Sequence, residues 1–220
     1  MCNKYMQSVI SVFELLKSIK SFDELVAKSI RIQDNFGYLL CVSELHVDDE
    51  FVIALMAKWR KAATTFHDEF EVTHESTKRW LRKLLLDVPD RILFLVLNRH
   101  GHPIGHMGFA NGINDNSILE IDNVIRGEHG QDKGLMILAM KSMLTWAEST
   151  FKPAGYFLRT FNDNTHAIEF YLKLGFKIEE KQKLPTEKIG ESYKNQVKVD
   201  WTNSNNRYFI YMNLNINDLK

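Results

Sequence analysis

The strongest constraint on the fold is a strand, a helix and a second strand in direct succession. Residues 118–125 and 156–161 are expected to be strands, and apolar side chains at helical spacing predict a helix over residues 135–148. Such a unit places its two strands parallel in one sheet and uses the helix as a right-handed crossover. We therefore expect a mixed α/β fold with its parallel strand pair in residues 118–161.

The segments around this unit complete a mixed sheet with flanking helices. An antiparallel meander is expected before the parallel pair, because turn residues separate three consecutive strands. Residues 1–35 are interpreted as an N-terminal helical extension, and residues 36–220 as one domain. The expected strands are 38–45, 91–97, 104–110, 118–125, 156–161, 176–182 and 208–214; helices are expected twice within 8–32 and at about 49–63, 73–88, 135–148 and 165–173.

Charge and cysteine content exclude several classes of protein. Lys+Arg and Asp+Glu both number 28, so the net charge is zero, which argues against binding to nucleic acid or to an anionic membrane. Two cysteines provide neither a disulfide framework nor a cysteine zinc site. The longest strongly apolar run, 92–97, is far shorter than the roughly 20 residues of a membrane span, and the first residues lack the layout of a signal peptide. We expect a soluble, cytoplasmic protein.

The loop between the strand at 118–125 and the helix at 135–148 is a candidate anion site. The first N–H groups of a helix have no partner within the helix, and they attract negative charge. Gln131, Asp132, Lys133 and Gly134 lie at this turn, where glycine lets the backbone approach a phosphate closely. The loop matches neither a P-loop nor a dinucleotide-binding pattern. The alternative is an ordinary connecting turn.

A second segment gives this loop a functional interpretation. Residues 164–176 read NTHAIEFYLKLGF, which places Asn164, Ala167 and Tyr171 on one face of a short helix. Together with the loop, this segment resembles the GNAT superfamily of acyl-CoA N-acyltransferases over residues 38–182. The loop matches the phosphate-binding motif of the superfamily at Gln131 and Gly134. It departs at Met136, where a small residue is usual.

The resemblance implies a fold and a set of contacts to acetyl-CoA. The fold is a GNAT-like central mixed sheet in which the parallel pair splays apart to admit the acyl-CoA. Pantetheine would pair with the backbone of Val124 and Ile125, and Asn164 would make a polar contact. The pyrophosphate would lie on backbone amides of a run of six residues: Gln131, Asp132, Lys133, Gly134, Leu135 and Met136.

Candidate catalytic residues follow from the same resemblance. Acyl transfer to an amine needs a base for the amine and an acid for the departing thiolate. Tyr171 matches the position of the phenol near the acetyl sulfur, although a packing role is the alternative. Glu120 and Asp122 alternate along one strand and therefore share a face, so either is a candidate base. The alternative is that these acids are exposed or bind Arg126.

The acceptor is expected to be a small amine, with an amino sugar or nucleotide sugar as one possibility. Arg60, Phe66 and His67 lie where the superfamily places its acceptor-binding loop. Acetylation of a protein N-terminus or lysine is the alternative reaction, and a catalytically silent acyl-CoA-binding module is the alternative function. A monomer or homodimer is expected, without a metal, because histidines such as His106 near a Gly- and Pro-containing hairpin are usually solvated.

Overall fold

The computed structural model describes residues 4–63, 71–130, 132–183 and 208–216. Its centre is an eight-stranded sheet with the order β1-β2-β3-β4-β5-β6-β8-β7. Only β5 and β6 pair in parallel among these neighbours. The expected mixed α/β fold is thus confirmed, with an antiparallel meander before the parallel pair. The strands are β1 (Ile30–Ile32), β2 (Gly37–Cys41), β3 (Ile92–Asn98), β4 (Pro103–Ala110), β5 (Ile118–Arg126), β6 (Gly155–Phe161), β7 (Lys177–Lys183) and β8 (Tyr208–Asn215).

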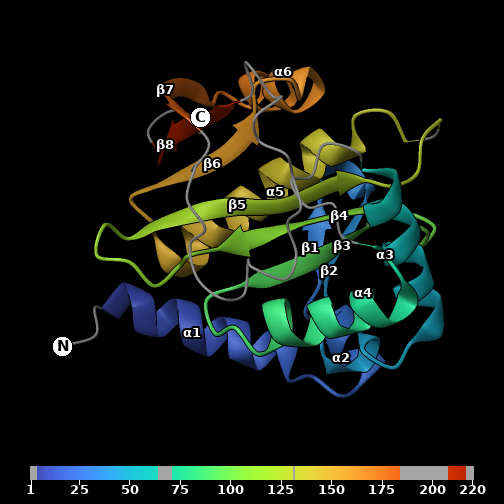
Figure 1. The fold of residues 1–220 in the computed structure, drawn as a ribbon. Coiled ribbons are helices and arrows are strands. Elements are labelled where there is room, and N and C mark those ends of the chain that lie inside the picture. The colour runs from blue at the N-terminus through green and yellow to red at the C-terminus, as the bar shows by residue number, and fades with distance from the viewer. Residues whose placement is uncertain (1–3, 64–70, 131, 184–207, 217–220) are drawn as a thin grey trace.

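Helices flank both faces of the sheet. Figure 1 shows α3 and α4 in front of it and α5 behind, where α5 forms the crossover between β5 and β6. The last part of α4 continues as a π-helical segment, η3. The helices are α1 (Lys4–Lys17), α2 (Phe22–Ala27), α3 (Glu50–Ala62), α4 (His74–Trp80), η3 (Leu81–Leu86), α5 (Leu135–Phe151) and α6 (Thr165–Lys173), with short 3-10 turns at Gln33–Asn35 and Glu44–His46.

The N-terminal segment packs into the same core as the rest of the chain. Val9 and Phe13 of α1 are fully buried, and the Phe13 ring meets the Phe151 ring of α5 edge-on at 5.6 Å. The ammonium of Lys17 donates a hydrogen bond to the carbonyl of Val88 at 2.6 Å, which ties α1 to the end of η3. The domain boundary expected at residue 35 remains a prediction.

Part of the expected helical region before residue 33 is a strand. Ile30 was assigned to a helix from its apolar spacing, but residues 30–32 form β1 and pair with β2 at the edge of the sheet. Ser21 is the N-cap residue of α2, and its side chain makes no capping hydrogen bond. Three residues are too few for a strand period to stand out against a helical one.

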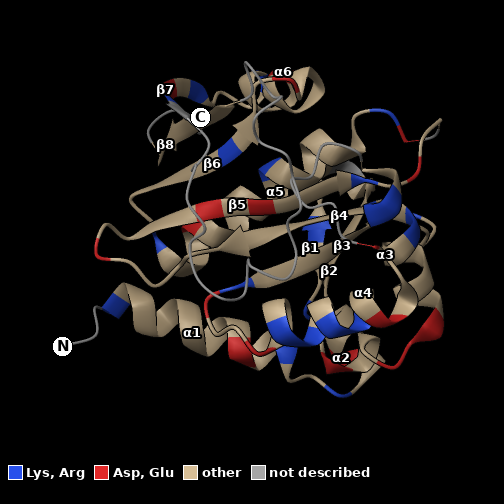
Figure 2. Cartoon of the chain, viewed as in Figure 1, with Lys and Arg blue, Asp and Glu red and all other residues tan. Residues whose placement is uncertain are grey.

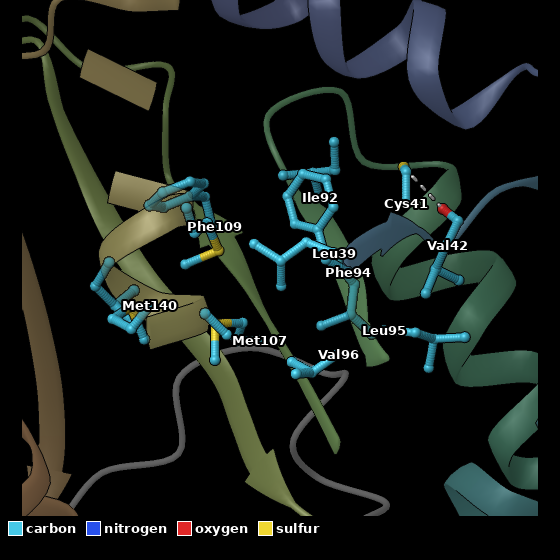
Figure 3. Close-up of a cluster of buried hydrophobic side chains, with 14 of the residues drawn as sticks. Leu39, Cys41, Val42, Ile92, Phe94, Leu95, Val96, Met107, Phe109 and Met140 are labelled. Atoms are coloured by element: carbon cyan, nitrogen blue, oxygen red, sulfur yellow. Dashed lines mark hydrogen bonds between the residues drawn. The ribbon is translucent and has the colours of Figure 1, made fainter. Parts of the chain in front are cut away.

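One part of the core lies between the sheet and α5, and another part includes the buried apolar side chains of α3 and η3. On β3 and β4, Ile92 lies opposite Phe109, and Phe94 lies opposite Met107, so all four project from one face. Figure 3 shows this cluster with Met140 of α5 packed beside it. The acids of β5 lie on the other face, which also carries buried apolar side chains of β3. In the described residues, no helix is long and apolar enough to cross a membrane.

Candidate active site

The two parallel strands separate after three paired positions. The last pair in the register is Glu120 with Phe157, although β5 continues to Arg126 and β6 to Phe161. Figure 1 shows β6 turning away from the line of β5. Val124 and Ile125 lie in the separated part of β5. Their backbone groups on the β6 side are therefore positioned for an extended ligand, as an exposed sheet edge is.

A β-bulge shapes the same part of β5. The register with β4 passes from Gly108 opposite Asp122 to His106 opposite Ile125, which leaves one additional residue on β5. Asn123 lies there with φ of +52°, in the left-handed region. The bulge interrupts the simple alternation of side chains that the sequence suggests.

His106 supports this bulge from β4. The sequence led us to expect a solvated histidine, but His106 is fully buried beside the ring of Trp59. Its pKa is lowered to about 4, chiefly by burial and also by the nearby charge of Arg60, against a hydrogen bond to Asn123 that raises it. The expectation was wrong because His106 lies inside β4 and faces α3. The ring is therefore neutral at pH 7.

The start of α5 has an open approach. Gly134 precedes the helix with φ of +84°, and a Cβ atom added there would meet no atom of the described residues within 4 Å. Lys133 is exposed and Asp132 is partly buried, whereas Leu135 and Met136 are buried. Met136 therefore directs its bulk into the core. Gln131 lies outside the described residues.

The two acids of β5 share a face, as expected, and each has an arginine partner. Glu120 is buried; its Oε1 accepts a hydrogen bond from Nε of Arg159 at 3.0 Å and forms an ion pair with Nη2 of the same residue at 2.9 Å. Its Oε2 accepts from Nδ2 of Asn111. Figure 2 shows the acidic stretch of β5 beside a basic position on β6. Both carboxylate oxygens of Glu120 are thus engaged.

Asp122 is bound through one oxygen. Its Oδ2 lies 3.3 Å from Nε of Arg91 and accepts from Nδ2 of Asn123 at 2.6 Å. A quarter of the Asp122 side chain is exposed, compared with 8% for Glu120. The expected alternative partner, Arg126, instead donates through Nε to the carbonyl of Glu128.

Tyr171 lies within electrostatic reach of Asp122. Its side chain is 7% exposed and contacts the rings of Phe170 and Phe176 edge-on. Burial raises the pKa of the Tyr171 phenol well above its usual range, and the charge of Asp122 raises it further. The phenol is therefore protonated and able to donate a hydrogen bond.

The remaining expected contacts are partly structural. Asn164 caps α6, and its side-chain oxygen accepts from the amide of Ala167 at 3.3 Å. Arg60 is 9% exposed, donates to Oγ1 of Thr77 at 3.3 Å and lies over the Trp80 ring at 4.4 Å, which joins α3 to α4. Phe66 and His67 lie outside the described residues.

The sequence analysis missed the two arginines that neutralise the acids. Arg159 lies two positions beyond the last paired residue of β6, and Arg91 precedes β3. The sequence feature that could have identified them is a basic residue within or next to an otherwise apolar strand. In the described part of the chain, no three His, Cys, Asp or Glu side chains gather closely enough to hold a metal ion.

Comparisons with known proteins agree with this geometry. Residues 40–177 match the family model described as acetyltransferase (GNAT) domain. A probable GNAT-family acetyltransferase from Chromobacterium violaceum has a similar fold, with 15% identity, a TM-score of 0.62 and 85% of each chain covered. No curated protein sequence matches the chain.

Two further solved structures show the same fold. A structure titled "Apo FdhC- a nucleotide-linked sugar GNAT" is 16% identical, with a TM-score of 0.57 over 84% of this chain and 89% of that one. Spermidine N-acetyltransferase from Vibrio cholerae, solved with CoA and spermine, is 15% identical, with a TM-score of 0.59 over 82% of this chain and 96% of that one.

Proposed function

The chain belongs to the GNAT acetyltransferase family, and we propose that it is an acetyl-CoA-dependent N-acetyltransferase that transfers directly to a small amine. The observation that carries this proposal is the separation of β5 and β6 beyond Glu120 and Phe157, beside the start of α5. An open strand edge suits an extended amide-containing chain, and a helix start suits a pyrophosphate.

The residues present fit such a ligand. The backbone of Val124 and Ile125 would hold pantetheine, and the amides from residue 131 to Met136 would hold the pyrophosphate. The space beside Gly134 supports this assignment, since no atom of the described residues lies within 4 Å of a Cβ placed there. The side-chain oxygen of Asn164 caps α6, so its side-chain nitrogen would make the polar contact to the ligand. Acetyl-CoA supplies an acetyl group activated as a thioester.

Asp122 and Tyr171 are the proposed catalytic pair. An amine is mostly protonated at neutral pH and must lose a proton before it can attack, and a carboxylate assists this directly or through water. Asp122 suits the base better than Glu120, because Glu120 is more buried and has both oxygens engaged. Tyr171 carries a phenol that keeps its proton and can donate it toward the sulfur.

The charge around the site favours a small amine over a polyamine. Each acid of β5 is paired with an arginine, Glu120 with Arg159 and Asp122 with Arg91, so the cluster has no net charge. A polycation is attracted most strongly to unpaired carboxylates. We therefore infer an amino sugar or a nucleotide-linked amino sugar as acceptor class, with a protein N-terminus or lysine as the alternative.

Measurement of free CoA thiol release tests the proposal. The purified chain is incubated with acetyl-CoA and a panel of amino sugars, nucleotide-linked amino sugars, polyamines and peptides. We expect micromolar acetyl-CoA binding, about −8 kcal/mol, and release accelerated by amino sugars. Absence of binding at millimolar acetyl-CoA would contradict the entire proposal, and acceleration by polyamines or peptides alone would overturn the acceptor class.

Two observations favour a second candidate, a silent acyl-CoA-binding module. The arginine pairing of both acids and the burial of Tyr171 leave few groups exposed for proton transfer. Such a module would bind acetyl-CoA, and no amine would accelerate thiol release. A cytoplasmic location and a monomeric or dimeric state remain predictions; sedimentation measures the latter.

A further inference from the structure

Asn98 joins the turn after β3 to the loop before α5. Its side chain is 2% exposed, and its Oδ1 accepts hydrogen bonds from the amides of His100 and His102, both at 3.0 Å. Its Nδ2 donates to Oδ2 of Asp132 at 3.0 Å. The two amide donors require the oxygen on the turn side, so the NH₂ group faces the carboxylate. One buried side chain thus connects segments 34 positions apart.

The position of Asp132 makes this contact unusual. Aspartate before a helix commonly caps the first free amides. Here Gly134 occupies the N-cap position of α5 without a side-chain capping bond, and Asp132 has φ of +54°. The carboxylate of Asp132 is bound to Asn98 instead. A carboxylate over the helix start would repel an incoming phosphate and compete for the same amides.

The second acid of the same loop is also bound outside it. Glu128 accepts from Nζ of Lys58 at 2.7 Å and from Nε1 of Trp59 at 2.9 Å, both on α3. Glu128 and Asp132 are the acids between β5 and α5. Both are therefore held by side chains from other elements, Glu128 by α3 and Asp132 by the end of β3.

We propose that Asn98 is a positioning residue for acyl-CoA binding, which holds the Asp132 carboxylate away from the amides at the start of α5. This inference rests on the proposed function, because it assumes that the pyrophosphate binds those amides. Asn98 does not touch the ligand. It acts through Asp132, by fixing both the direction of the carboxylate and the left-handed backbone at that residue.

An exchange of charge between the two residues tests the proposal. Asn98→Asp keeps an oxygen for the amides of His100 and His102 but places a carboxylate oxygen against Asp132. We expect repulsion to release Asp132 toward the helix start and to raise the acetyl-CoA dissociation constant about tenfold or more. In the double variant Asn98→Asp/Asp132→Asn, the new amide donates to the new carboxylate, and affinity should return to within about threefold of wild type.

Asn114 provides a matched control. It organises the connection between β4 and β5, where its Oδ1 accepts from the amide of Ile118 and its Nδ2 donates to the carbonyl of Asn111. Among the described residues, these hydrogen bonds join Asn114 to its own connection and not to the loop before α5, so Asn114→Asp should lower the unfolding temperature and leave acetyl-CoA affinity unchanged. The same calorimetric titration is used for every variant.

The outcomes separate this inference from the proposed function. Failure of the wild-type chain to bind acetyl-CoA would contradict the proposed function. Binding by wild type that Asn98→Asp leaves unchanged would overturn the positioning role. A double variant that recovers the wild-type unfolding temperature but not the affinity would also overturn it, because the contact would then serve stability alone.

Discussion

The Nδ1 atom of His106 on β4 lies 2.6 Å from the carbonyl oxygen of Asn123 on β5. A carbonyl only accepts, so Nδ1 carries the proton, and Nε2 holds a lone pair in the neutral ring. That Nε2 atom is buried without a hydrogen-bond partner in the described structure. The imidazole therefore supports the bulged carbonyl at the position where β5 separates from β6.

This arrangement predicts a loss of stability on acidification. Burial lowers the pKa of His106 from 6.5 to about 4, so below pH 6.5 the unfolded chain binds more protons at this residue than the folded chain. The free energy of unfolding should fall as the pH decreases from 6.5 to 4, by up to about 3 kcal/mol from this residue. Urea unfolding at several pH values measures this slope.

His106→Asn is the matched control for that slope. The asparagine amide can still donate to the carbonyl of Asn123, but it does not titrate. The difference in unfolding free energy between wild type and variant should therefore change with pH, while contributions from other groups cancel. Parallel curves for the two proteins between pH 7 and pH 4 would show that His106 does not carry the effect.

A second prediction concerns Tyr171. Tyr171→Phe keeps the ring packed against Phe170 and Phe176 and removes only the hydroxyl. Turnover should fall about 10²-fold, with acetyl-CoA affinity close to wild type. An ordinary tyrosine loses its proton as the pH approaches 10. Because burial raises the pKa of Tyr171, ionisation of its phenol should not lower the rate between pH 8 and pH 10. Unchanged turnover at saturating substrates would make Tyr171 a packing residue.

The two acids of β5 should differ in what they contribute. Asp122→Asn should lower turnover about 10²–10⁴-fold if Asp122 is the base. Glu120→Gln should act mainly on stability, by about 1–3 kcal/mol, because it weakens a pair with the partly exposed Arg159. Turnover and urea unfolding of both variants measure the contrast. A larger loss of turnover in Glu120→Gln than in Asp122→Asn would reverse the assignment.

The sequence predicts the fold more completely than the site. Runs of β-favouring residues between turn residues identify the meander, and the helical spacing of apolar residues identifies the crossover helix. The pairing of Glu120 with Arg159 depends on the register between β5 and β6, which no local spacing determines. The bulge at Asn123 is equally hidden, because the order of side chains in β5 does not reveal that its register with β4 shifts by one residue there.

The last prediction concerns Gly134 at the start of α5. Gly134→Ala should raise the acetyl-CoA dissociation constant about tenfold or more, because the methyl group would stand where the backbone approaches a phosphate. An added Cβ meets no atom of the described residues within 4 Å, so we expect the variant to strain the free protein through the φ of +84° and not through a clash. Alanine in that left-handed conformation costs about 1–2 kcal/mol. Calorimetric titration measures the affinity.

A variant at Gly175, which follows α6, is the control that distinguishes a loss of affinity from the effect of backbone strain. Its φ is +93°, and an added Cβ would lie at an ordinary contact distance of 3.5 Å from Leu214. Gly175→Ala therefore carries a similar left-handed strain at a position outside the loop before α5. Both variants should lose comparable unfolding free energy, and only Gly134→Ala should bind acetyl-CoA more weakly. Equal affinities in the two variants would mean that the backbone at Gly134 does not contact the ligand.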